Sequence, residues 1–81
     1  MTTTNAELAG MVQRVRNAAA NVGLDSAGWT LHGGNATHHI QYKLTTGKSV
    51  IGLGFSKDSA WFVLAALETA WLMVEDNRKA E

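Results

Sequence analysis

The stretch from Ala60 to Val74 constrains the fold of this chain more than any other feature. It reads AWFVLAALETAWLMV, so Glu68 and Thr69 interrupt an otherwise apolar run. The run is shorter than the about 20 residues that a helix needs to cross a bilayer. It is also too apolar for a surface helix that packs one side on its own core and keeps the other side in water. We therefore expect a helix of a globular protein that meets a partner as well as its own core.

A helical wheel divides this run into two sides. The side expected to pack on the rest of the chain holds Ala60, Val63, Leu64, Leu67, Trp71 and Val74. The opposite, outward side holds Trp61, Phe62, Ala65, Ala66, Thr69, Leu72 and Met73. In water, these side chains would form a larger apolar patch than monomers usually expose. The outward side is thus predicted to bind a second copy or another protein, unless the first helix or a terminal segment covers it.

The composition indicates a small domain in a reducing compartment. The chain has 81 residues and no cysteine, so no disulfide supports its small core. The N-terminal sequence MTTTNAELAG lacks the pattern of a secretory signal. The formal net charge is 0, which provides no general attraction for nucleic acid. We expect a single cytoplasmic domain over residues 1–81 that gains burial by oligomerisation.

A first helix is predicted near the N-terminus. Thr4 and Glu7 form a capping box, in which each side chain accepts a hydrogen bond from the other residue's backbone N–H. The apolar stripe of this helix consists of Leu8, Met11, Val12, Val15, Ala18, Ala19 and Val22. Gly23 can take the left-handed conformation that ends a helix, with Leu24 as the hydrophobic partner of a Schellman ending.

From Gly28 to Phe55 the apolar period changes to two, which indicates strands. The residues expected to share a face are Trp29 and Leu31 in the first strand, His38, Ile40, Tyr42 and Leu44 in the second, and Ile51, Leu53 and Phe55 in the third. A second helix follows, with Ser56 as its N-cap and Asp58 near the positive end of its dipole. The predicted fold class is α+β: a three-stranded antiparallel sheet with two helices packed on one face, in the order α-β-β-β-α.

This order and the segment GLGFSKDSAW resemble the double-stranded-RNA-binding domain. That family typically carries Gly-x-Gly-x-Ser-Lys-Lys-x-Ala-Lys before an alanine-rich turn. The matching residues are Gly52, Gly54, Ser56, Lys57 and Ala60, with Ala65 and Ala66 near the later alanines, Tyr42 at an aromatic of the second strand and His38 at the loop histidine. The resemblance implies the α-β-β-β-α fold.

Two departures from the family pattern fall at positions that contact RNA. Asp58 and Trp61 stand where the family has lysines that approach phosphates. Recognition of duplex RNA depends on phosphate and 2′-OH contacts, so the loss of these cations removes much of the electrostatic attraction. Weak RNA binding would then require a substitute patch formed by Lys43, Lys48 and Lys57.

The segment GGNATHHIQY is similar to the element that opens the second strand in HicA-type toxins, which are ribonucleases of the same general fold. In that family a histidine after Ser or Thr is catalytic, and it corresponds here to His38 or His39. An imidazole with a pKa near about 6.5 suits proton transfer at a ribose 2′-OH. The resemblance implies a ribonuclease toxin with these catalytic residues. If the chain is not such a toxin, no catalytic residue is predicted.

No metal or cofactor is predicted. His32 and His39 could share an exposed face of the sheet, but two imidazoles fall short of the three protein ligands typical of a catalytic zinc site. The segment TTGKS lacks the upstream glycine of a phosphate-binding loop and lies in a hairpin.

The leading hypothesis is therefore a non-enzymatic interaction protein that acts through the outward side of its second helix. A neutral version of a nucleic-acid-binding fold would suit a phage or mobile-element protein that inhibits a host nucleic-acid-processing complex, by analogy with anti-CRISPR proteins. Its expected partner is a second copy or a host protein, and no binding to a membrane is expected. The alternatives are the HicA-like ribonuclease and the weak double-stranded RNA-binding module.

Overall fold

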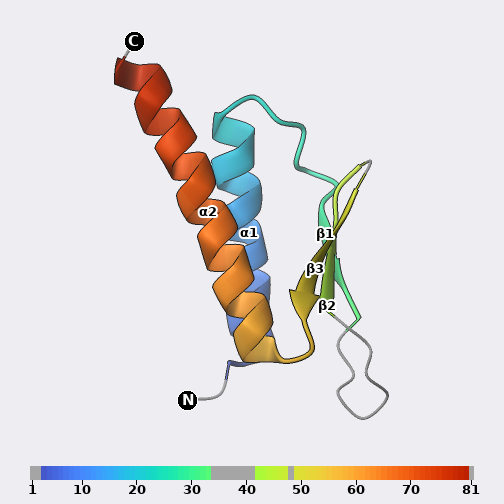
Figure 1. Cartoon of the computed structure of the whole chain (residues 1–81). Coiled ribbons are helices and arrows are strands. Elements are labelled where there is room, and N and C mark those ends of the chain that lie inside the picture. Colours follow the sequence, from blue (N-terminus) through green and yellow to red (C-terminus); the bar gives the residue numbers. More distant parts are fainter. Residues whose placement is uncertain (1–2, 34–41, 48, 81) are drawn as a thin grey trace.

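The computed structural model describes residues 3–33, 42–47 and 49–80. Its elements are α1 (Asn5–Asn21), β1 (Thr30–His32), β2 (Tyr42–Thr45), β3 (Val50–Gly54) and α2 (Lys57–Ala80). The predicted α-β-β-β-α order and the α+β class are confirmed. Figure 1 shows both helices side by side on one face of the sheet.

Both ends of α1 form as its sequence predicts. The Glu7 N–H donates to the Thr4 Oγ1 at 3.1 Å, and the Thr4 N–H donates to the Glu7 Oε1 at 3.2 Å, which completes the capping box. At the other end Gly23 has a φ of 92°. The Gly23 N–H donates to the Ala20 carbonyl at 3.0 Å and the Leu24 N–H to the Ala19 carbonyl at 3.1 Å, the two bonds of a Schellman ending.

The sheet is an antiparallel meander in the order β1-β2-β3, as predicted. Leu44 in the central strand is opposite Leu31 on one side and Ile51 on the other. A tight turn joins β2 to β3, in which the Thr46 N–H donates to the Ser49 carbonyl at 2.9 Å. The predicted second strand also included His38, His39 and Ile40, which lie outside the described residues.

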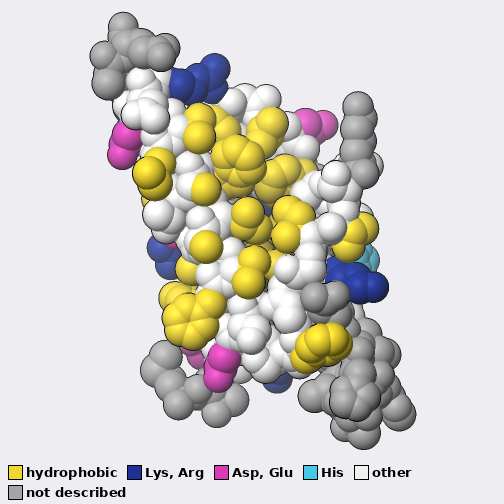
Figure 2. Space-filling model, viewed as in Figure 1, with side chains coloured by type: hydrophobic (Ala, Val, Ile, Leu, Met, Phe, Trp, Pro, Cys, Tyr) yellow, Lys and Arg dark blue, Asp and Glu magenta, His cyan; other side chains and the backbone are white. Residues whose placement is uncertain are grey.

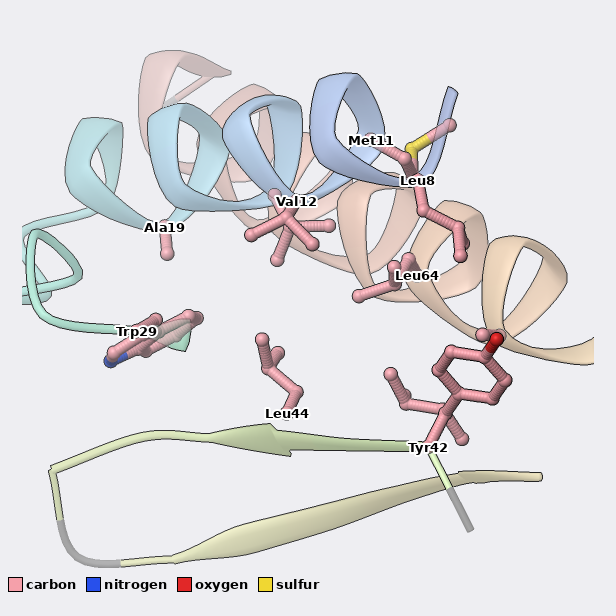
Figure 3. Packing of buried hydrophobic residues seen from close by; sticks show 11 residues of the cluster. Leu8, Met11, Val12, Ala19, Trp29, Tyr42, Leu44 and Leu64 are labelled. Atoms are coloured by element: carbon pink, nitrogen blue, oxygen red, sulfur yellow. The ribbon is translucent and has the colours of Figure 1, made fainter. Parts of the chain in front are cut away.

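The core lies between the helices and the sheet. The buried apolar residues are Leu8, Met11, Val12, Val15 and Ala19 on α1, Trp29 before β1, Tyr42, Leu44 and Leu53 on the sheet, and Ala60 and Leu64 on α2. In Figure 3 the side chains of Val12 and Ala19 point from α1 toward the sheet, and Leu64 reaches the same space from α2. The apolar stripe predicted for α1 is therefore its buried side, although Val22 at its end is only half-buried.

One residue predicted to belong to the third strand and to share a face with Ile51 and Leu53 lies outside it. Phe55 was expected to continue the row of Ile51 and Leu53, but β3 ends at Gly54 and the Phe55 side chain is 52% exposed. The physical reason is the φ of 91° at Gly54, which turns the chain out of the strand before Phe55.

The first turn of α2 anchors the N-terminal segment of the chain. Ser56 caps the helix as predicted, because the Ser59 N–H donates to the Ser56 Oγ at 3.0 Å. The Asp58 Oδ1 accepts the Thr3 N–H at 2.8 Å and the Thr3 hydroxyl at 2.5 Å. Thr3 is only 6% exposed, so these two bonds attach the start of the chain to the start of α2.

These bonds predict a dependence of stability on pH. Both bonds from Thr3 stabilise the charged carboxylate and lower the pKa of Asp58 below its ordinary value of 3.8. A carboxyl group with a lower pKa in the folded state stabilises that state at pH values above its ordinary, unfolded-state pKa. This stabilisation is lost as the pH falls through the folded-state pKa.

Urea unfolding of the wild type and Asp58→Asn, repeated from neutral to acidic pH, measures this contribution. The wild type should lose more stability than Asp58→Asn on acidification, because the asparagine cannot titrate. Parallel pH profiles for the two proteins would contradict the role assigned to Asp58.

Candidate functional site

Four residues form an exposed strip along α2, which we call the outer strip: Phe62, Ala66, Thr69 and Met73. Their separations of four, three and four residues place them on one side of the helix. Phe62 is 69% exposed and Met73 is 62% exposed, the two highest values among the large apolar side chains described in α2. The outer strip is therefore an apolar surface that the described part of the chain leaves in water.

The other three residues predicted to face outward lie nearer to α1. Trp61, Ala65 and Leu72 share a flank of α2 with Glu68, at separations of seven, three and four residues. The Arg14 side chain of α1 binds the Glu68 carboxylate through its Nε at 2.7 Å and its Nη2 at 2.9 Å. This flank consequently faces α1.

The contact with α1 changes the environment of this flank. Trp61 and Ala65 are half-buried and pack against the core cluster, so a fully outward position for them was wrong. Leu72 keeps 43% of its surface exposed, as expected of an outward residue. The Trp61 ring also meets Phe62 edge to face, with centroids 5.7 Å apart and planes at 86°. Trp61 thus supports one end of the outer strip from the side.

A third side of α2 turns toward the sheet, and we call it the sheet-side flank: Val63, Leu67, Ala70 and Val74. Val63 and Leu67 are half-buried against the core, as predicted. Val74 was predicted to be buried as well, but it is 40% exposed. Measured from Lys57, the first residue of α2, it lies about 25 Å along the helix, whereas the five residues of β3 extend only about 17 Å.

Trp71 packs against the core close to this flank, as predicted. Its indole Nε1 is buried and has no hydrogen-bond partner within the described residues. An unpaired buried donor costs about 1 to 3 kcal/mol.

Charged residues lie at the margins of the apolar surface rather than within it. In the sequence of α2, no charged residue occurs between Asp58 and Glu68. Near the end of α2, Lys79 pairs with Glu75 at 3.1 Å and the Arg78 Nη1 donates to the Val22 carbonyl at 2.7 Å. Figure 2 shows the result: hydrophobic side chains gather along the centre of the face in view, and charged ones lie around it. A dry centre with a polar rim is typical of protein interfaces.

Of the three lysines predicted to form a patch for nucleic acid, the two described ones lie apart, on β2 and at the start of α2. Lys43 is exposed on β2 between the buried Tyr42 and Leu44, so its side chain points to the sheet face away from the helices. Lys57 lies in the first turn of α2, on the helix side of the sheet, next to Asp58. Lys48 lies outside the described residues. The two described lysines thus belong to different sides of the sheet.

The histidines proposed for catalysis, His38 and His39, also lie outside the described residues. His32 is exposed on β1, and its Nε2 is 2.7 Å from the Thr30 hydroxyl. Within residues 3–33, 42–47 and 49–80, no three His, Cys, Asp or Glu side chains lie close enough together to hold a metal ion.

A groove between α1 and β1 is a feature that the sequence did not suggest. It has a volume of about 730 Å³, and its lining includes Val12, Arg16, Trp29 and Tyr42. The Arg16 guanidinium donates through Nε to the Ser26 carbonyl at 3.4 Å and through Nη2 to the Ala27 carbonyl, so the loop after α1 holds it in place. The described lining contains no Asp, Glu or His.

None of the protein-family models, curated proteins or solved structures compared with this chain matches it. Among the described residues, neither helix combines the length and the apolar character that spanning a membrane requires.

Proposed function

We propose that this protein is a non-enzymatic interaction module that binds a partner protein through the outer strip of α2. The observation that carries the proposal is the exposure of Phe62 at 69% and Met73 at 62% on the side of α2 that faces away from the core cluster. Exposed aromatic and methionine side chains are enriched at protein interfaces relative to other surfaces.

The shape of the outer strip favours a helix as the bound segment of the partner. Its separations of four, three and four residues are those of the apolar seam in a pair of packed helices. The large side chains Phe62 and Met73 stand at its ends, and the smaller Ala66 and Thr69 lie between them. A partner helix could place its own large side chains over this low centre, as amphipathic helices do in apolar grooves.

The biological role that we attach to this binding is inhibition of a host nucleic-acid-processing complex by a phage or mobile-element protein. Two observations support it. The first is the α-β-β-β-α order. The second is that Trp61 on the apolar α2 stands where the double-stranded-RNA-binding family has a lysine that approaches phosphates. The ribonuclease and RNA-binding alternatives remain predictions from resemblance. The ribonuclease would be favoured if expression of the protein is toxic and His38→Ala or His39→Ala abolishes the toxicity. The RNA-binding module would be favoured if the protein binds duplex RNA in a salt-dependent way and Lys57→Glu abolishes the binding.

Site-specific photo-cross-linking in host cells tests the proposed binding surface. A photoreactive amino acid at Phe62 should cross-link one discrete protein. The same amino acid at Ala20, which is exposed on α1, should not. Adding Met73→Glu to the Phe62 probe should remove the cross-link, because a carboxylate would then lie in the apolar strip. Identical cross-links from both positions, or none from Phe62, would contradict the proposal.

A further inference from the structure

The outer edge of β3 is an unprotected sheet edge. In the described sheet β3 pairs with β2 alone, so alternate residues of Val50–Gly54 direct their backbone N–H and C=O groups away from the sheet. Proteins usually protect such an edge with charged side chains or proline. The sequence VIGLG contains neither, and Gly52 and Gly54 leave the backbone accessible.

The sheet-side flank of α2 begins above this same edge and, at Val74, extends past the end of β3. α2 packs on β3 and β2, whereas α1 packs on β1, so α2 covers the β3 side of the sheet. Val63 and Leu67 are only half-buried there, Val74 is 40% exposed and Ala70 is exposed. The apolar side chains that Figure 2 shows along the centre of this view cover both α2 and the region beside β3. Two features that need a partner, a backbone edge and an apolar flank, therefore occur together.

We infer that a second copy of this chain covers both features. In this arrangement β3 pairs antiparallel with β3 of the second copy about a two-fold axis perpendicular to the sheet, and a continuous six-stranded sheet results. That axis keeps the helices of both copies on the same face. It also places the two α2 helices side by side, with their sheet-side flanks in contact. One symmetry operation pairs the free backbone groups and buries the flanks.

The absence of charge on this surface is the reason to choose a second copy over another protein. In a two-fold interface the same surface patch of both copies is in contact, so a charged residue near the axis lies close to the same charged residue of the second copy. Neither β3 nor the sheet-side flank carries a charged residue, and the formal net charge of the chain is 0. Long-range repulsion between two copies is consequently minimal. The exposed Ala70 is also small enough for two helices to approach closely.

This dimer adds to the proposed function without depending on it. The outer strip lies on a different side of α2 and stays uncovered, so the dimer presents two outer strips on one face. Such a dimer would bind a two-fold symmetric partner, or a partner with two sites, more tightly than a monomer would.

Ala70→Glu and Thr69→Glu form a matched pair of variants for this inference. Both positions are exposed in the middle of α2, and both substitutions add one carboxylate, but Ala70 lies on the sheet-side flank and Thr69 on the outer strip. Sedimentation equilibrium over a dilution series should show a dimer for the wild type. Ala70→Glu should raise the dissociation constant at least about tenfold, whereas Thr69→Glu should change it less than about twofold. A monomeric wild type, or equal effects of the two variants, would overturn the inference.

Amide hydrogen exchange provides a second readout that does not depend on a variant. In the dimer, the outward N–H groups of β3 should exchange at least about tenfold more slowly than in the diluted monomer, because the second copy binds them. Unchanged protection of β3 in a sample that sedimentation shows to be dimeric would overturn the inference. Met73→Glu should leave this dimer intact while it weakens binding of the partner protein. The inference about the dimer and the proposal about the outer strip can therefore be contradicted separately.

Discussion

Replacement of Leu64 by alanine is expected to lower the free energy of unfolding by about 3 to 5 kcal/mol. Leu64 is 0% exposed and extends from α2 into the core between the helices and the sheet, where Figure 3 shows it. The substitution removes buried apolar atoms and leaves a cavity. In a chain of 81 residues the whole free energy of unfolding is only about 4 to 12 kcal/mol, so much of it would be lost.

Leu72→Ala is the matched control for Leu64→Ala. It makes the same change on the same helix, but the Leu72 side chain is 43% exposed, so the expected loss is about 1 kcal/mol or less. Urea unfolding followed by circular dichroism measures both values. Equal losses for the two variants would contradict the assignment of Leu64 to the core and of Leu72 to the surface.

Gly54→Ala is expected to lower the free energy of unfolding by about 2 to 4 kcal/mol, for two separate reasons. Gly54 has a φ of 91°, a conformation that residues with a Cβ rarely adopt. A Cβ at this position would also lie 2.8 Å from the Ser59 Cβ in the first turn of α2. Because the chain passes from β3 to α2 at this point, relief of the contact would displace one element from the other.

Gly10→Ala should have the opposite effect. Gly10 lies within α1 and is exposed, and a Cβ added there would have no described atom within 4 Å apart from its chain neighbours and the nearby α1 backbone. Alanine is the better helix former by about 0.5 to 1 kcal/mol, so the free energy of unfolding should rise by that amount. Thermal unfolding of both variants tests the pair. A Gly54→Ala protein as stable as the wild type would contradict the turn geometry described for β3 and α2.

The features that the sequence predicted correctly are those that neighbouring residues determine. The capping box of Thr4 and Glu7 and the ending at Gly23 are each formed within a few residues. The same holds for the Ser56 cap and for the turn between β2 and β3. The segments between these caps and turns were assigned by the spacing of their apolar residues. A period of about four residues indicated the helices, and a period of two residues indicated the strands.

The wrong predictions concern residues whose environment depends on a distant element. A helical wheel gives the angle between side chains, but not the direction in which the sheet or α1 lies. It therefore placed Val74 inside, although β3 is too short to reach it, and Trp61 fully outside, although the flank of Glu68 faces α1. The pairing of Glu68 with Arg14 was the available signal, since an acidic residue in an apolar run needs a cationic partner.

Two further features could not be read from local pattern. The bonds from Thr3 to Asp58 join positions 55 residues apart. The alternation of Ile51, Leu53 and Phe55 gives no sign that the chain turns at Gly54, because glycine also occurs within ordinary strands. For the candidate site, the sequence identified the outer strip correctly as an exposed surface, and the division of α2 into three sides needed the structure.

The most direct test of the outer strip is the affinity of the cross-linked partner, purified and titrated calorimetrically against three forms of the protein. Met73→Glu should weaken binding at least about a hundredfold, since a carboxylate would replace one of the two large apolar side chains that the partner covers. Gln13→Glu, at an exposed position of α1, should bind like the wild type. Unchanged affinity for Met73→Glu, or an equal loss for Gln13→Glu, would contradict the assignment of the outer strip as the binding surface.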